Sequence, residues 1–121
     1  MKTAKDPRHL KRIKLMQALF SWQFRSGKKP TKKLEPITSN LSEIDKLIGK
    51  CAPDRPITEI NKVDLSILRL AVFELIIDKG APPKVVIDEA VELGKEYGSD
   101  SSSSFINGVL GKLVEIKKIK T

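Results

Sequence analysis

Apolar residues recur along this chain at intervals of three and four positions, and no segment sustains an alternation of apolar and polar residues. The first pattern is typical of amphipathic helices and the second of strands. The spacing predicts five main helices, at residues 6–24, 40–52, 62–78, 83–97 and 103–119. We therefore expect an all-α fold, a compact helical bundle.

Residues that typically begin or end helices stand at several of these boundaries. Asp6 can cap the first helix and Asn61 the third, because their side-chain oxygens accept hydrogen bonds from the first backbone N–H groups. Asn40 or Ser42 can serve the same purpose at the second helix. Gly98 follows the fourth helix, where glycine commonly adopts the left-handed conformation that closes a helix.

The length of 121 residues is that of one small domain, and 40% of the residues are hydrophobic, enough to form a buried core. The helix at 62–78 is apolar on most faces, which is typical of the central helix of a bundle. Segment 25–38 combines glycine, proline and lysine without an apolar period, which predicts a mobile lysine-rich linker. A single domain, 1–121, thus contains a basic helix at 6–24, this linker and a helical bundle at 39–119.

Positive charge is concentrated at the start of the chain. Residues 1–33 contain eleven basic side chains and one acidic one, a net charge of +10, whereas the remaining residues contain twelve basic and fourteen acidic ones, a net charge of −2. Such asymmetry favours a polyanionic partner, and nucleic acid is the partner that basic patches typically bind. Two alternatives are a solvated basic tail that aids solubility and a membrane surface, which the lack of a continuous apolar face behind the cations disfavours.

The first helix changes character along its length. Its first half carries Arg8, Lys11 and Arg12, whereas its second half is apolar on most sides. We expect the apolar half to be buried and the basic first turn to project from the protein. Cations on such a turn need only reach phosphates, because Coulomb attraction tolerates loose geometry.

Residues that could carry out catalysis are scarce. His9 lies among cations, which disfavours a general base, and we expect it at the surface, as a phosphate contact or without a role. The acidic side chains of the fourth helix are expected mostly on its solvated outer face: Asp88, Glu89, Glu92 and Glu96. We expect no enzyme activity, no cofactor and no small-molecule substrate.

Cysteine usage and hydropathy indicate the compartment. Cys51 is the only cysteine, which excludes an internal disulfide, favours a reducing environment and, with a single histidine, excludes a Cys/His zinc site. No apolar run approaches the roughly 20 residues needed to span a bilayer. The N-terminus lacks the apolar stretch of a signal peptide. The expected location is therefore cytoplasmic.

The head of the last helix combines polar and aromatic residues. Phe105 lies at the margin of the apolar stripe, and Asn107 lies off it, beside Gly108. The N–H groups at a helix start attract phosphate, an exposed phenylalanine can stack on an unpaired base, and an asparagine can bind a base edge. The alternative is that Phe105 belongs to the core and Asn107 forms only a local hydrogen bond.

Four motifs together carry a family resemblance. They are QALFSWQ at 17–23, ILRLAVFEL at 67–75, PPKVVIDEAVELGK at 82–95 and FINGVLGK at 105–112. In this order they resemble the NusB family of transcription antitermination factors. The last two motifs are the specific ones, whereas the first would be weak alone.

The resemblance implies a small, all-helical RNA-binding protein. Members of the family bind the single-stranded boxA element of nascent ribosomal RNA leaders together with NusE, a ribosomal protein. The complex then helps to convert RNA polymerase to a termination-resistant form. This function needs no catalytic residues.

The resemblance also implies roles for individual residues. The basic first turn would grip the boxA backbone through Lys5, Arg8, His9, Lys11 and Arg12. Phe105 and Asn107 would meet bases, and Ser103 and Ser104 would cap the helix beside them. Glu59 and Asp64 would face the basic NusE partner. We expect the first turn and the head of the last helix to lie side by side, as one cradle for the strand.

The chain departs from the family between Phe24 and Ile44. Typical members have a longer segment there, which forms an extra helix of an N-terminal bundle, so we expect that bundle to be reduced. Two other functions stay open. One is a helical protein-interaction adaptor whose basic arm meets an acidic protein, and the other is an rRNA-binding relative of the N-terminal domain of an rRNA cytosine methyltransferase.

Overall fold

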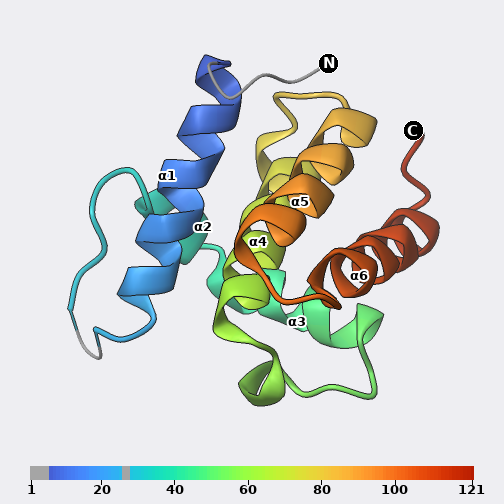
Figure 1. Ribbon diagram of the computed structural model, residues 1–121, viewed down its shortest axis with the longest axis horizontal. Helices are drawn as coiled ribbons and strands as arrows, with labels where there is room; N and C mark the ends of the chain where they lie inside the picture. Colours follow the sequence, from blue (N-terminus) through green and yellow to red (C-terminus); the bar gives the residue numbers. More distant parts are fainter. Residues whose placement is uncertain (1–5, 26–27) are drawn as a thin grey trace.

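Helices account for most of the structure, a computed structural model that describes residues 6–25 and 28–121 (Figure 1). These residues contain no strand. In chain order the elements are α1 (Pro7–Trp22), α2 (Glu35–Thr38), α3 (Leu41–Cys51), the 3₁₀ turn η1 (Ile57–Glu59), α4 (Lys62–Val72), the π-helical η2 (Phe73–Asp78), α5 (Pro83–Tyr97) and α6 (Ser102–Lys117). The five long helices confirm the predicted all-α bundle. None of the described helices is both long and apolar enough to cross a membrane.

The central helix of the bundle is α4. It packs against α1, α3, α5 and α6, and Figure 1 shows α1 on one side of it and the α5–α6 pair on the other. Every residue from Asp64 to Val72 is buried. The prediction that this helix is central is confirmed, because a helix covered on all faces needs apolar residues on all faces.

Two of the predicted helix caps are present and one is not. Asp6 Oδ1 accepts from the Arg8 N–H at 2.9 Å, and Asn61 Oδ1 accepts from the Val63 N–H at 2.8 Å. The prediction for α3 was wrong: no side chain caps it. Asn40 instead donates from Nδ2 to the carbonyl of Pro36 at 2.7 Å, so its side chain closes the end of α2 rather than the start of α3.

Gly98 ends α5, but not in the predicted conformation. Its φ of −94° lies outside the left-handed region. A Cβ on Gly98 would collide with the side chain of Ser102, the first residue of α6. That side chain is fully buried and accepts from the Ser99 N–H at 2.8 Å. Glycine is required here because α6 starts directly against the end of α5.

The segment predicted as a linker, 25–38, is not free of helix. Its last four residues form α2, and Leu34 and Ile37 are buried. The carbonyl of Thr31 accepts from the N–H groups of Leu34 and Glu35, at 3.0 and 3.1 Å, which closes the turn before α2. The prediction was wrong here, because two apolar residues three positions apart are too short a pattern to reveal a helix.

Candidate nucleic-acid interface

Arg12 joins the first half of α1 to two other elements. Its Nε and Nη2 donate to the two carboxylate oxygens of Glu74 in η2, at 2.9 and 2.7 Å, and its Nη1 donates to Glu89 of α5 at 3.3 Å. The side chain is only 11% exposed. The hydrogen bonds that Arg12 donates to Glu74 raise the pKa of Arg12 further. Arg12 therefore positions α1 within the bundle, and the expectation that it projects toward phosphates was wrong.

His9 is buried beside the same carboxylates. Its Nδ1 lies 3.1 Å from Glu89 Oε1, and its Nε2 lies 3.3 Å from Glu96 Oε1. Each ring nitrogen thus faces a carboxylate oxygen, to which an N–H at that position donates. The expectations of an exposed His9 and of an outward-facing Glu89 were both wrong. The physical reason is shared: α5 turns carboxylates inward, toward the cations of α1.

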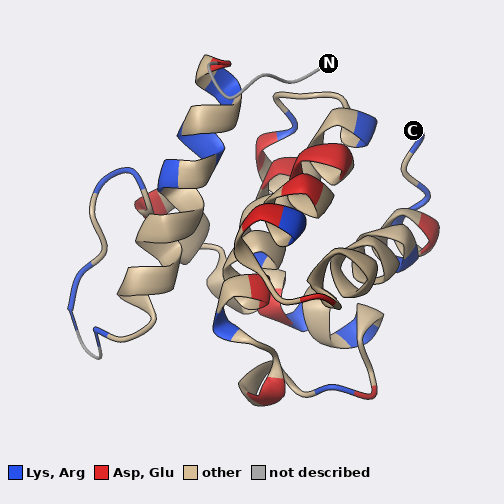
Figure 2. Ribbon diagram, in the orientation of Figure 1, with Lys and Arg blue, Asp and Glu red and all other residues tan. Residues whose placement is uncertain are grey.

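Three cations of α1 remain exposed. Arg8, Lys11 and Lys14 follow one another at intervals of three, and the Arg8 side chain is 84% exposed although its guanidinium approaches the Asp6 carboxylate to 3.4 Å. Figure 2 shows basic positions along the upper part of α1. Lys5 lies outside the described residues. Of the predicted phosphate contacts on α1, the structure leaves Arg8 and Lys11 accessible.

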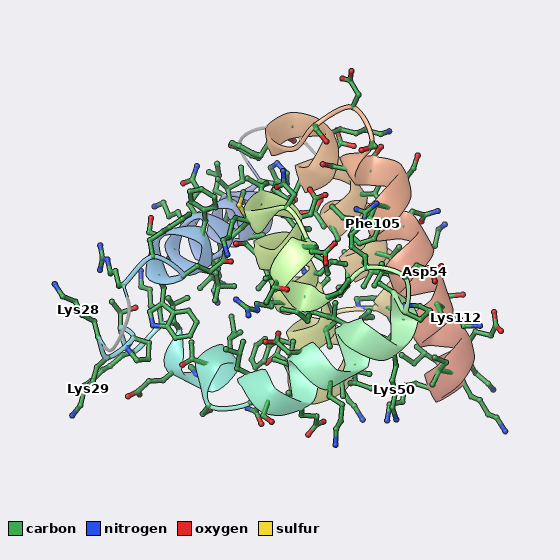
Figure 3. All side chains as sticks on the ribbon, turned by 90° about the horizontal axis from the view of Figure 1, so that it is seen from below. Lys28, Lys29, Lys50, Asp54, Phe105 and Lys112 are labelled. Carbon is green, nitrogen blue, oxygen red and sulfur yellow. The ribbon has the colours of Figure 1, made fainter. Side chains whose placement is uncertain are left out.

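The head of α6 presents an aromatic ring near the surface. Phe105 is partly buried against the core, and the guanidinium carbon of Arg55 lies 4.2 Å from the centre of its ring. Arg55 itself is exposed. Figure 3 shows Phe105 on the same side of the molecule as Asp54 and Lys112. The ring thus has the core on one side and a cation over it, a cation–π contact.

The polar residues around Phe105 differ in their positions. Asn107 and Ser104 are exposed, whereas Ser103 is half-buried. Neither serine caps the helix, since α6 begins at Ser102 and no side-chain hydrogen bond caps it. The prediction of capping serines was therefore wrong. Asn107 remains available to a ligand.

Arg55 is a residue that the sequence analysis missed. It lies between Pro53 and Pro56, in the turn that follows α3. Nothing in the sequence relates Arg55 to Phe105, fifty positions further along the chain. An arginine in a proline-flanked turn is a weak signal by itself.

The two predicted RNA-binding regions do not form one continuous cradle. Figure 1 shows α5 between α1 and α6, and the last turn of α5, which leads into the head of α6, contacts the start of α1 through Glu96 and His9, 3.3 Å apart. Figure 2 shows acidic positions along the intervening α5. A nucleic-acid strand that reaches both regions must pass a negatively charged helix. The two regions thus lie near the same end of α5, but α5 stands between them.

The two acidic residues predicted to face a protein partner have opposite environments. Glu59 is exposed in η1, whereas Asp64 is only 3% exposed. Asp64 therefore does not offer a surface for docking, and that expectation was wrong.

Comparisons with known proteins identify the family. A model of the NusB family matches residues 31–115. A transcription antitermination protein NusB of Syntrophus aciditrophicus is 50% identical over 80 residues, which cover 66% of this chain and 50% of the relative. That of Lachnoclostridium phytofermentans is 43% identical over 83 residues, which cover 69% of this chain and 63% of the relative. The chain thus matches about half to two thirds of the length of these relatives.

Solved structures resemble the fold over nearly the whole chain. NusB of T. maritima superposes with a TM-score of 0.83 at 33% identity, covering 95% of this chain and 93% of that one. A crystal structure of the antitermination factors NusB and NusE in complex with double-stranded RNA gives a TM-score of 0.78 at 27% identity, covering 92% and 99%. The motifs, the fold and these matches together show that the chain belongs to the NusB family.

Proposed function

We propose that this chain is an RNA-binding transcription antitermination factor, which binds boxA-type single-stranded RNA of ribosomal RNA leaders together with NusE. The names of the relatives and the NusB–NusE–RNA complex among the similar structures support this proposal. Under this proposal, the chain joins an antitermination complex with RNA polymerase in the cytoplasm. It catalyses no reaction and needs no cofactor.

The observation that carries the proposal is the contact between Arg55 and Phe105. Unpaired bases stack on aromatic rings and on guanidinium planes, and here the two are joined at 4.2 Å. Because Phe105 also packs against the core, its ring is held in place before any ligand arrives. A base can stack on the outer face of Arg55, or on Phe105 after Arg55 swings aside. The exposed amide of Asn107 lies two positions further along α6 and can bind a base edge.

The exposed cations of α1 provide the electrostatic part of the interface. In the proposal Arg8 and Lys11 bind phosphates, with Lys5 as a further contact. His9 and Arg12 do not contact RNA but hold α1 in place, because their contacts with Glu89 and Glu74 fix this helix against the bundle. Phosphate contacts raise affinity for all RNAs, whereas base stacking provides the preference for boxA.

The NusE contact is proposed on the side of η1. Glu59 is exposed there and can meet a basic partner. Asp64 is buried and is left out of this surface.

The test is a binding titration of boxA RNA and of a scrambled RNA, with and without NusE. Phe105→Ala should weaken boxA binding by about 1–3 kcal/mol, the value of one stacked base, and leave scrambled RNA nearly unaffected. Arg8→Gln with Lys11→Gln should weaken both RNAs alike. Equal losses on the two RNAs from Phe105→Ala would contradict the stacking role. Binding of NusE without binding of any RNA would contradict the whole proposal and favour the adaptor.

A further inference from the structure

The two ends of α1 carry equal formal charge. Residues 1–14 contain six basic side chains and one acidic one, and residues 25–33 contain five basic side chains and no acidic one, so each region has a net charge of +5. The ten residues between them, 15–24, carry no charge. We call the second group the lysine segment: Arg25, Lys28, Lys29, Lys32 and Lys33.

The structure compensates the two groups differently. At the start of α1, Arg12 is bound by Glu74 and Glu89, and Arg8 approaches Asp6. All five cations of the lysine segment are exposed, and within the part of the chain that is described none of them pairs with a carboxylate. Among the described residues, more unpaired cations therefore lie at the end of α1 than at its start, where the predicted phosphate site is.

Figures 1 and 3 place the lysine segment away from the rest of the interface. In both views it lies on the far side of α1 from α6, and Figure 3 shows Lys28 and Lys29 pointing outward, opposite to Phe105. A single turn of RNA at the head of α6 does not reach it. The lysine segment is thus a separate surface, not an extension of the Phe105 site.

Both ends of the segment are held by the fold. On one side the Gln23 amide is bound to α4, and the Arg25 N–H donates to the carbonyl of Trp22 at 2.9 Å. On the other side Leu34 is only 2% exposed, and the turn that carries Lys32 and Lys33 is closed by the carbonyl of Thr31. The fold therefore positions both ends of the segment, Arg25 on one side and Lys32 and Lys33 on the other, which lowers the entropy lost when these cations bind a ligand.

An aromatic ring stands beside these cations. Phe24 is 62% exposed, and its ring meets that of Phe20 in an edge-to-face contact with centroids 5.2 Å apart. Proteins that bind single-stranded nucleic acids combine cations along the backbone with aromatic rings on which bases stack. A membrane surface would require a continuous apolar face, which one ring does not provide.

We propose that the lysine segment and Phe24 form a second contact for single-stranded RNA, which binds nucleotides that flank the segment held at α1 and α6. This inference rests on the proposed function of the chain. The exposed side of α1, with Arg8, Lys11 and Lys14, provides a route between the two contacts. The 16 residues of α1 span about 24 Å, which corresponds to about seven nucleotides at the 3.4 Å spacing of a stacked strand.

The experiment compares two RNAs and two variants of equal charge. One RNA has the length of boxA, and the other is extended by about ten nucleotides, more than the roughly seven that α1 spans. The test variant is K28Q/K29Q/K32Q/K33Q. The control is K46Q/K84Q/K117Q/K120Q, which removes the same charge from exposed lysines elsewhere. Affinities are measured by fluorescence anisotropy over a series of salt concentrations.

The test variant should lose affinity for the extended RNA and retain that for the short one. Each phosphate neutralised on a single strand contributes about 0.7 to the slope of log affinity against log salt, so four lysines account for a decrease of up to about 2.8. Phe24→Ala should weaken binding of the extended RNA about fivefold or more. The control variant should behave alike on both RNAs.

Two results overturn the inference. One is an extended RNA that binds wild-type protein no more tightly than the short RNA, and the other is equal behaviour of the test and control variants on the extended RNA. Both leave the proposed function intact, because wild-type protein would still bind the short RNA. If wild-type protein bound neither RNA, the proposed function and this inference would fail together.

Discussion

The heads of α1 and α6 were both predicted as RNA-binding regions, and the fold uses them differently. At α1, carboxylates of η2 and α5 bind two of the predicted contacts: His9, which is buried, and Arg12, which is largely covered. At α6, Phe105 stays near the surface and gains a cation from Arg55. Two of the cations at the head of α1 are thus held by carboxylates within the protein, whereas the ring at the head of α6 remains open to a ligand.

This difference shows that formal charge in a sequence does not indicate available charge. The cations of α1 meet Glu74, 62 positions away, and Glu89, 77 positions away. A buried ion pair contributes position and specificity more than net stability, but breaking it leaves an uncompensated charge. Substitutions that separate structural from binding roles therefore test the comparison directly.

The largest expected effect comes from Arg12→Met. It leaves the Glu74 carboxylate without the guanidinium that binds both of its oxygens, and removal of one partner from such a largely covered pair costs up to about 3–5 kcal/mol. Urea unfolding followed by circular dichroism measures this loss. Lys11→Gln, one position away and exposed, is the matched control, and should change the free energy of unfolding by less than about 0.5 kcal/mol.

In RNA binding, Lys11→Gln should have the larger effect of the two variants. Lys11→Gln should weaken the binding of all RNAs, because Lys11 remains exposed and available to phosphate. Equal free energies of unfolding of Arg12→Met and Lys11→Gln would show that Arg12 has no structural role.

The next effect concerns the junction that positions the head of α6. Gly98→Ala places a Cβ against the side chain of Ser102, and such overpacking typically costs about 1–3 kcal/mol. Gly108→Ala is a matched control in α6, since its Cβ meets no atom within 4 Å, and it should stabilise the protein by about 0.5–1 kcal/mol. Thermal unfolding distinguishes the two. Equal effects would show that α5 and α6 do not meet as closely as the structure indicates.

The positions of the long helices could be predicted from the sequence, because each buries one face or, for α4, every face. The partners of the charged residues could not. Whether Arg12 faces water or Glu74 depends on how α1 rotates against η2, which local patterns do not encode. Gly98 shows a subtler failure: the sequence indicated glycine at a helix end, but its reason is the approach of Ser102 and not a left-handed backbone.

A smaller effect tests the open head of α6. Arg55→Lys retains the charge but loses the planar group over Phe105, so boxA affinity should decrease about fivefold, or about 1 kcal/mol. Scrambled RNA, bound through charge, should be unaffected. Arg8→Lys is the control, because Arg8 has no aromatic partner in the described structure and is proposed to bind phosphate alone. Competition between the two RNAs measures the preference, and an unchanged preference in Arg55→Lys would remove Arg55 from the site.

The smallest effect is the pH dependence of the α1 cap. Hydrogen bonds from the Arg8 backbone and side chain lower the pKa of Asp6 below its ordinary value of 3.8. The ionised carboxylate therefore stabilises the native state above that value, and this contribution is lost as the pH falls through the lower, native-state pKa. Asp6→Asn keeps a capping oxygen but does not titrate. As the pH falls below 3.8, the free energy of unfolding of wild-type protein should therefore decrease relative to that of Asp6→Asn. Urea titrations at several pH values measure it, and a difference independent of pH would show that the contacts of Asp6 with Arg8 do not favour its ionised form.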